Sequence, residues 1–191
     1  MHCGKPLKIA EKEFCEDCEE KDSWYQAGRS VWLHQEPVSD ALYRFKYHNR
    51  RCYAEVFAEQ MYRCYGNQLK EWEIEEMIPI PLHPSRKRKR GFNQSEILAE
   101  HLAERMELPV KKRVLYRIKK TKPLKEMNGK ERWMNLQGAF GVSSQWKPCR
   151  NVLLIDDIYT TGSTVEKAAK MLRKAGAENV YFLTVSIGQG R

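Results

Sequence analysis

The chain has 191 residues and a mass of 22.5 kDa, enough for one full domain with a small appendage but not for two large domains. Hydrophobic residues make up 41% and charged residues 31%, which excludes collagen-like and disordered classes. No apolar stretch approaches the ~20 residues that span a bilayer, and charges interrupt the start of the chain where a secretory signal needs an apolar core. We therefore expect a cytoplasmic protein without membrane insertion.

The net charge of +9 comes from one region of the chain. Residues 83–132 hold 16 Lys and Arg against 6 Asp and Glu, whereas the remainder is nearly balanced. Such a segment is typical of proteins that bind nucleic acid, nucleotides or pyrophosphate, although a basic surface that is simply exposed to solvent has the same composition. The densest run consists of Arg86, Lys87, Arg88, Lys89 and Arg90. It predicts a site for pyrophosphate or for the backbone of single-stranded DNA.

Two aromatic residues lie near this basic region in the sequence. Phe92 and Trp133 are candidate platforms for stacking bases, but buried core positions are the commoner place for such side chains. His83, which precedes the basic run, is expected to be structural rather than catalytic.

The cysteines near the N-terminus favour metal binding over disulfides, because no secretion signal is visible. Cys15 and Cys18 form a C-x-x-C pair, and Cys3 followed by glycine has the form of a second knuckle. Residues 1–22 are too polar for a core and need a staple. We predict a zinc-ribbon-like segment over 1–22 with Cys3, Cys15 and Cys18 on a structural Zn²⁺. The fourth ligand stays open between His2 and a cysteine upstream of Met1.

The hydrophobic spacing of the remaining chain predicts an alternation of helices and strands. In chain order we expect helices over 38–47 and 53–66, a strand over 77–81, a helix over 95–106, a strand over 114–118, a buried strand over 151–155, a helix over 163–175 and a strand over 180–187. Cys52 and Cys64 are expected as small apolar fillers of the second helix. Residues 119–132 are polar and basic, which predicts a mobile loop. The closing strand, helix and strand predict a parallel crossover, and hence an α/β domain over 28–191.

The most informative stretch joins the strand at 151–155 to the helix at 163–175. The strand delivers Asp156 and Asp157 at its carboxyl end, where open α/β sheets bind ligands. A turn rich in hydroxyl groups around Gly162 then opens the helix, whose free amides and dipole favour a phosphate. Carboxylates beside a phosphate cradle predict a sugar phosphate, with ribose hydroxyls or Mg²⁺ on the acids. An ordinary strand and a Thr-capped helix is the alternative. A Walker A motif is excluded by the spacing.

The segment Ile155–Thr164 resembles the 5-phosphoribosyl-1-pyrophosphate (PRPP) loop of type I phosphoribosyltransferases. The resemblance implies that Asp156 and Asp157 are the catalytic acids that hold the ribose hydroxyls. It also implies a 5′-phosphate site formed by Tyr159, Thr160, Thr161, Gly162, Ser163 and Thr164. Purine-salvage members carry an acid where Thr160 stands, so this sequence disfavours a salvage enzyme.

Further segments narrow the resemblance. Residues 79–84, 90–94 and 132–140, followed by the PRPP loop, resemble the ComF/ComFC family of late-competence proteins of DNA uptake, and the likeness extends from Cys3 almost to the C-terminus. The resemblance implies a type I phosphoribosyltransferase-like parallel sheet flanked by helices, together with a zinc-binding segment. It also implies binding of PRPP with Mg²⁺, and single-stranded DNA and other competence proteins as partners. This sequence departs from the family pattern at two places. Leu124 stands where the family often has Gln, and the family spacing C-x-x-C-G-K-P around Cys3 would place its first cysteine just before Met1.

Three functions are consistent with these features. The first is a PRPP-binding accessory protein of DNA uptake. The second is an active phosphoribosyltransferase that acts on an unidentified nucleophile. The third is a PRPP-sensing regulator without chemistry.

Overall fold

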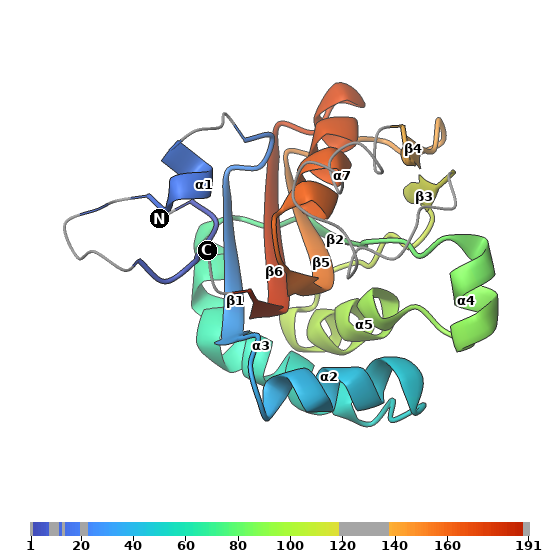
Figure 1. Cartoon of the computed structure of the whole chain (residues 1–191). Helices are drawn as coiled ribbons and strands as arrows, with labels where there is room; N and C mark the ends of the chain where they lie inside the picture. Colours follow the sequence, from blue (N-terminus) through green and yellow to red (C-terminus); the bar gives the residue numbers. More distant parts are fainter. Residues whose placement is uncertain (1, 8–11, 13, 20–22, 119–137, 189–191) are drawn as a thin grey trace.

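The computed structural model describes residues 2–7, 12, 14–19, 23–118 and 138–188, and it shows an α/β fold (Figure 1). The elements are α1 (Glu16–Glu19), β1 (Ala27–Leu33), α2 (Val38–Tyr47), α3 (Tyr53–Glu71), β2 (Glu76–Pro79), α4 (Pro84–Arg90), α5 (Gln94–Met106), β3 (Leu115–Arg117), β4 (Phe140–Val142), β5 (Asn151–Tyr159), α7 (Ser163–Lys174) and β6 (Asn179–Ile187). The predicted loop over 119–132, Leu124 and Trp133 lie outside the described residues.

The main sheet has four strands in the order β1-β6-β5-β2, and every neighbouring pair is parallel. The predicted crossover is confirmed, because α7 joins the parallel neighbours β5 and β6. The strand β1 was not predicted from the sequence. In its register Gly28 faces Phe182, and a Cβ at Gly28 would lie 1.9 Å from the phenyl ring. A glycine is therefore required where β1 packs against β6.

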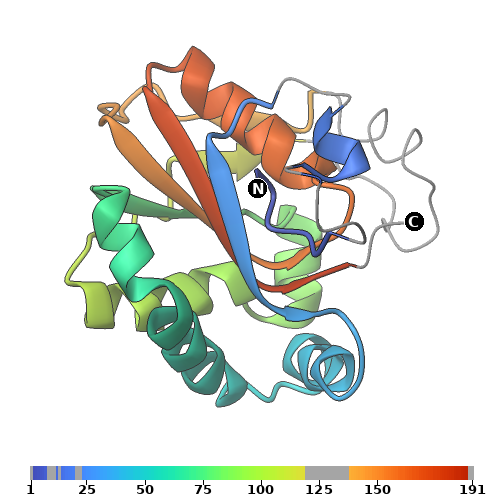
Figure 2. The same cartoon turned by 90° about the vertical axis from the view of Figure 1, so that its left-hand side faces the viewer.

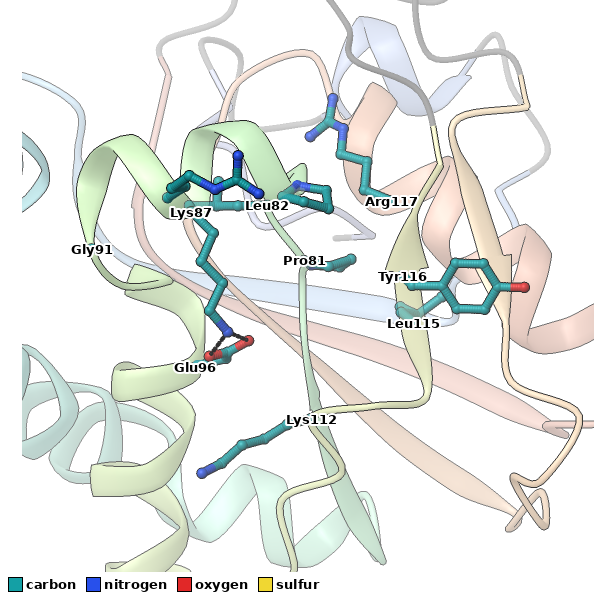
Figure 3. Close-up of a pocket in the computed structure, with 11 residues that line it drawn as sticks. Pro81, Leu82, Lys87, Gly91, Glu96, Lys112, Leu115, Tyr116 and Arg117 are labelled. Carbon is teal, nitrogen blue, oxygen red and sulfur yellow. Dashed lines mark hydrogen bonds and ion pairs between the residues drawn. The ribbon is translucent and has the colours of Figure 1, made fainter.

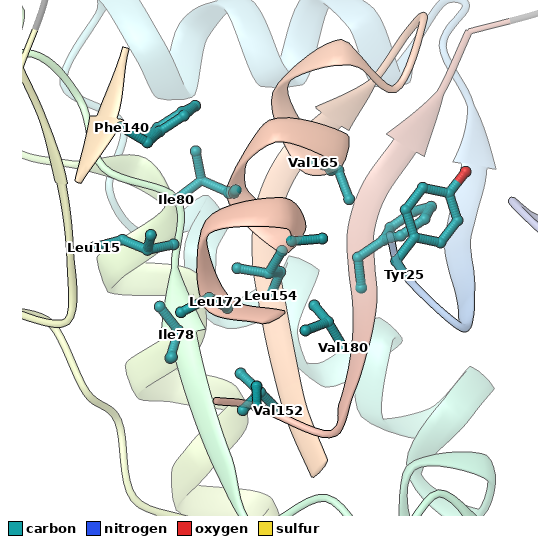
Figure 4. Close-up of a cluster of buried hydrophobic side chains, with 14 of the residues drawn as sticks. Tyr25, Ile78, Ile80, Leu115, Phe140, Val152, Leu154, Val165, Leu172 and Val180 are labelled. Atoms are coloured by element: carbon teal, nitrogen blue, oxygen red, sulfur yellow. The ribbon is translucent and has the colours of Figure 1, made fainter. Parts of the chain in front are cut away.

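Side chains of β5 alternate between two hydrophobic cores. Val152 and Leu154 point toward α7, where Figure 4 shows them packed with apolar side chains of the helix and of neighbouring strands. Leu153 and Ile155 belong to the core on the opposite face, which α2, α3 and α5 cover (Figure 2). Because both faces of the parallel sheet are buried, the strand reads as a continuous apolar run in the sequence.

A second, two-stranded antiparallel sheet, formed by β3 and β4, lies beside α7. Leu115 and Phe140 anchor it in the core that α7 shares with the main sheet (Figure 4). The sequence predicted β3 but not β4. Tyr116 pairs with Gly141, and its ring occupies the space that a Cβ at Gly141 would need. No helix within the described ranges is both long and apolar enough to cross a membrane.

Two sequence expectations, on a helix end and on two cysteines, are corrected by the packing, and the core position favoured for Phe92 is confirmed. The helix predicted to end at Gly66 continues to Glu71, because a glycine is tolerated inside a helix and Tyr62 packs its ring over Gly66. Cys52 and Cys64 are exposed, so neither is a core filler. Phe92 is only 6% exposed and packs against Phe45, with 5.7 Å between the ring centroids, so its ring is unavailable for stacking bases.

Candidate functional site

The two acids lie inside β5 rather than beyond its end. Strand pairing continues from Asp156, opposite Thr184, to Tyr159, opposite Ile187. Asp156 is 8% exposed and Asp157 is 4% exposed. The expectation that the strand stops at residue 155 and leaves both acids outside the core is therefore wrong. Two buried carboxylates in succession are costly, since each needs a partner that offsets the loss of water.

Asp156 accepts two hydrogen bonds through Oδ1. One comes from the Oγ of Ser95, which is fully buried at the start of α5, and one from the backbone N–H of Asp157, both at 2.9 Å. Burial raises the pKa of Asp156 to about 7, and the neighbouring charge of Asp157 acts in the same direction. The carboxyl of Asp156 therefore holds or releases a proton near neutral pH.

Asp157 has a different partner, which sequence reasoning missed. Lys46 of α2 places its Nζ 2.5 Å from Oδ2 of Asp157, and both side chains are largely buried. At this separation the ammonium group of Lys46 is the direct counter-ion of Oδ2. An available signal was the position of Lys46 on the inner side of an amphipathic helix, where a charged head group must find a counter-ion.

The segment predicted to bind phosphate forms a tight turn between β5 and α7. Gly162 has φ +72° at the start of α7, and a Cβ there would lie 2.3 Å from the hydroxyl oxygen of Tyr159. The hydroxyl oxygens of Thr161 and Ser163 lie 2.9 Å apart. Tyr159 itself is buried, with its hydroxyl 2.9 Å from that of Tyr25, so its side chain supports the turn at Gly162.

The turn leads into α7, a helix of 12 residues, and the N-terminus of a helix favours an anion. The N-cap residue of α7 is Gly162, which has no side chain to accept a hydrogen bond from the first amides of the helix. The first amides of a helix lack intrahelical acceptors, and the dipole adds positive potential there. The arrangement suits a phosphate group held by Thr160 to Thr164.

The basic run forms α4, which begins at the same edge of the sheet. Because β2 and β5 are parallel, the chain leaves β2 toward α4 at the edge where β5 enters the phosphate turn. His83 caps α4, since its Nδ1 accepts a hydrogen bond of 3.2 Å from the backbone of Ser85, as its predicted structural role requires. Arg86 and Arg90 are partly buried, whereas the three basic residues between them are exposed.

An open pocket of about 560 Å³ lies between α4, α5 and β3 (Figure 3). Its basic lining includes Arg88, Lys112 and Arg117, while Lys87 on its wall pairs with Glu96 at 2.8 Å. Arg117 is 7% exposed, and burial lowers its pKa to about 10, so it remains protonated. The sequence analysis missed Arg117, although an arginine within an apolar strand was a usable signal.

Arg117 also links the pocket to the acidic pair. The positive charge of Arg86 lowers the pKa of Arg117, and the carboxylate of Asp156 raises it. These opposing effects require both charges to lie within electrostatic reach of the guanidinium. Arg86 and Asp156 therefore lie within electrostatic reach of the pocket.

The N-terminal cysteines come together as predicted. The Sγ atoms of Cys3, Cys15 and Cys18 lie within 4.8 Å of one another, and those of Cys3 and Cys15 are 3.4 Å apart. A hydrogen bond with Cys3 lowers the pKa of Cys18 to about 5, while the same contact and burial raise the pKa of Cys3. Thiolates at this spacing fit one tetrahedral Zn²⁺, whose Zn–S bonds are about 2.3 Å long.

His2 lies near the cysteine cluster but is not part of it. Within the described residues, the group able to hold a metal contains only the three cysteines. The ring of His2 stacks on Tyr25 with centroids 4.8 Å apart, and its Nε2 is buried without a hydrogen-bond partner among those residues. The fourth ligand is thus not identified by the described residues.

Comparison with known proteins defines the class of the domain. Residues 93–188 match the family described as Phosphoribosyl transferase domain, and this range holds α5, the acidic pair and the phosphate turn. The fold is accordingly a phosphoribosyltransferase-like parallel sheet flanked by helices, with a cysteine cluster compatible with a zinc-ribbon-like N-terminus.

Relatives over nearly the whole chain narrow the assignment. Competence protein F of Haemophilus influenzae is 30% identical over 184 residues, covering 94% of this chain and 80% of the relative. Competence protein ComFC of Streptococcus pneumoniae is 30% identical, with coverages of 94% and 77%. DNA utilization protein YhgH of Escherichia coli K12 is 26% identical, with coverages of 93% and 79%. The chain belongs to the ComF/ComFC family.

Proposed function

We propose that this chain binds PRPP together with Mg²⁺ at the carboxyl edge of its parallel sheet and acts in DNA uptake. The observation that carries the proposal is the continuity of one segment: β5 presents Asp156 and Asp157 and leads directly into a turn at Gly162 that opens α7. Ribose hydroxyls donate hydrogen bonds to carboxylates, and a 5′-phosphate suits the amides and hydroxyls of the turn.

In this proposal each part of the site has one task. Asp156 and Asp157 hold the ribose hydroxyls, the turn from Tyr159 to Thr164 holds the 5′-phosphate, and the arginines of α4 face the pyrophosphate. A ribose hydroxyl or a cation that binds Oδ2 of Asp157 would share this oxygen with the ammonium group of Lys46 or displace it. Bound Mg²⁺ would neutralise the pyrophosphate charge. Zn²⁺ at the three cysteines would have a structural role.

The cellular part of the proposal rests on relatives and charge. The relatives are named competence proteins and DNA utilization proteins. The excess positive charge over residues 83–132 favours a polyanion, and we propose single-stranded DNA as that partner, with other competence proteins as further partners. We propose a cytoplasmic location and a division into a zinc segment over 1–22 and the domain over 28–191.

Calorimetric titration with PRPP tests the binding site. We expect binding that requires Mg²⁺, and loss of binding in the double variant Asp156→Asn with Asp157→Asn. The matched control is Asp40→Asn, which removes an acid from an exposed pair with Arg44 on α2. Thermal unfolding of each protein establishes that it is folded. Unchanged PRPP affinity in the folded double variant would overturn the assignment.

The pocket in Figure 3 favours a second candidate function, that of an active phosphoribosyltransferase. Its volume of about 560 Å³ is in the range of small-molecule sites, and its Arg117 lies within electrostatic reach of Asp156. A nucleophile bound there would attack the ribose carbon that carries pyrophosphate. Pyrophosphate release in the presence of candidate acceptors, compared with Asp157→Asn, tests this function.

A further inference from the structure

Two tyrosines of α2 form an exposed aromatic surface. Tyr43 is 47% exposed and Tyr47 is 54% exposed, and their ring centroids lie 5.0 Å apart, as expected for side chains one helical turn apart. The ring of His48 lies 5.4 Å from that of Tyr43. We call these three residues the tyrosine face.

Cations border the tyrosine face. The guanidinium carbon of Arg90 lies 5.1 Å from the ring centroid of Tyr47, and a hydrogen bond from Arg90 to Gln94 orients this arginine. Burial lowers the pKa of Arg86, and Tyr47 and Arg90 are the titratable groups within electrostatic reach of its guanidinium, so both arginines at the ends of the basic run lie near this ring. Figure 1 shows the end of α2 and α4 on the same side of the molecule.

Asp40, the acidic residue nearest to Tyr43 in the sequence, does not neutralise Arg86 and Arg90. Its carboxylate instead pairs with Arg44, one helical turn further along α2, at 3.0 Å. Arg51, just beyond α2, adds a further cation and lies over the buried ring of Phe92 at 4.8 Å. The exposed rings therefore stand in positive surroundings, which disfavours a basic or purely apolar partner.

We propose that the tyrosine face stacks the bases of single-stranded DNA while the arginines of α4 contact its backbone. The inference rests on the proposed function, because it locates the DNA that the function requires. Exposed aromatic rings beside cations are the pattern that binds single strands without sequence preference. The face takes the place of Phe92, a stacking candidate from the sequence whose ring is buried.

The location separates the stacked bases from the ribose of PRPP, whereas the arginines of α4 serve both the DNA backbone and the pyrophosphate. Lys46 lies between Tyr43 and Tyr47 in the sequence of α2, but its ammonium group reaches Asp157 in the sheet. The helix therefore directs one side chain to the proposed PRPP site and the two rings to solvent. Variants of the rings are therefore expected to lower DNA affinity more than PRPP affinity, since the contact of Tyr47 with Arg90 is their link to the pyrophosphate.

Fluorescence anisotropy of a labelled oligo(dT) and of an abasic strand of the same length tests the inference. Loss of one stacked base changes affinity by roughly 5- to 150-fold. For Tyr43→Ala with Tyr47→Ala we expect at least a tenfold loss on oligo(dT), little change on the abasic strand and an unchanged salt slope. The double Phe variant is expected to retain affinity, whereas the double Leu variant is not, because leucine keeps apolar area without an aromatic face.

Two controls come from other exposed side chains. Val56→Ala removes a side chain of 56% exposure on α3 and is expected to leave DNA binding unchanged.

Tyr116→Ala tests the pocket of Figure 3 as a rival base site, and a loss of oligo(dT) binding confined to this variant would overturn the inference. Binding of oligo(dT) by the folded double Ala variant within twofold of wild type would also overturn it. Retained affinity for oligo(dT) in the double Leu variant would overturn the inference too, because leucine has no aromatic face on which a base can stack. A wild-type protein that binds neither strand would overturn the proposed DNA partner as well.

Discussion

Lys46 and Asp157 form a largely buried ion pair between α2 and the central strand β5, with 2.5 Å between Nζ and Oδ2. The lysine supplies a positive charge where the proposed function places a ribose hydroxyl or Mg²⁺. A ligand of that site therefore meets a carboxylate that already has a counter-ion. The affinity of the site for a cation depends on how readily Lys46 gives up this contact.

Replacing Lys46 by methionine is expected to destabilise the fold and to increase its dependence on Mg²⁺. Removing one partner of a buried pair costs about 3–5 kcal/mol, because the other charge is left uncompensated. Mg²⁺ is then expected to raise the melting temperature of the variant more than that of wild type. Thermal unfolding with and without Mg²⁺ measures both effects. The control Arg44→Met breaks an exposed pair of α2 and should change stability little. If Mg²⁺ raises the melting temperatures of Lys46→Met and wild type equally, Lys46 does not compete with Mg²⁺ for Asp157.

The two acids of β5 are expected to respond oppositely to neutralisation. Asp157→Asn leaves Lys46 without its counter-ion and should lower the melting temperature. Asp156→Asn removes a charge that burial disfavours and keeps an oxygen to accept from Ser95, so it should raise the melting temperature at neutral pH. Thermal unfolding of both variants at pH 8 makes the comparison. A lower melting temperature for both would show that the charge of Asp156 is needed by the fold.

The pKa of Asp156 adds a pH dependence with a definite sign. Its folded pKa of about 7 lies above its ordinary value of 3.8, so the folded protein binds the proton more tightly than the unfolded chain does. The resulting stability is fully present below pH 3.8 and is lost as the pH rises through 7, by about 1.4 kcal/mol for each pKa unit. The stabilisation by Asp156→Asn should therefore grow between pH 4 and 8. A constant difference from wild type would contradict this expectation.

The sequence predicted those parts of the site that lie along one continuous segment. The acids, the phosphate turn and α7 are contiguous, and their residue types alone suggested a sugar phosphate. The C-x-x-C spacing likewise predicted the grouping of Cys15 and Cys18. Lys46 and Arg117 come from separate elements, and only the packing of α2 and β3 brings them toward the acids. Their roles therefore required the fold.

The errors in the fold have local causes. A glycine is a frequent end signal for helices, but Gly66 is covered by Tyr62 and α3 continues past it. The strand β1 mixes polar and apolar residues around Gly28, so its weak alternation did not indicate a strand. Asp156 and Asp157 read as a strand end because acids are rare in buried strands, yet pairing with β6 extends through them.

Gly162→Ala is expected to weaken both the fold and PRPP binding. A positive φ disfavours alanine, and the new methyl group would meet the hydroxyl of Tyr159. We expect a loss of stability of at least ~1 kcal/mol and a larger PRPP dissociation constant. Chemical denaturation and calorimetry measure the two quantities. Gly91→Ala, also at positive φ but with only the flexible end of Arg51 nearby, is the control that should leave PRPP binding closer to wild type. Equal effects on PRPP binding would contradict a specific role of the turn.

Removal of one cysteine ligand should reduce the zinc content of the protein. Cys18→Ser is expected to lower bound zinc per chain and the melting temperature, because a structural zinc site contributes its binding energy to folding. Metal analysis after dialysis and thermal unfolding with a chelator measure these effects. Cys64→Ser, which replaces an exposed cysteine of α3, is the control. Equal zinc contents in the two variants would contradict a site at the cysteine cluster.

The residues of α4 are expected to contribute unequally to DNA binding. Lys87, Arg88 and Lys89 are all exposed, and Lys87 pairs with both carboxylate oxygens of Glu96, at 2.9 and 2.8 Å. Each phosphate contact on a single strand contributes about −0.7 to the slope of log affinity against log salt. Arg88→Ala with Lys89→Ala should therefore flatten the slope by about 1.4, taking each residue as one contact. Adding Lys87→Ala should flatten the slope by less than a further ~0.7, because Glu96 already neutralises this lysine. Anisotropy titrations over a salt series measure the slopes. A slope unaffected by the double variant would remove α4 from the DNA path and leave its charges to pyrophosphate.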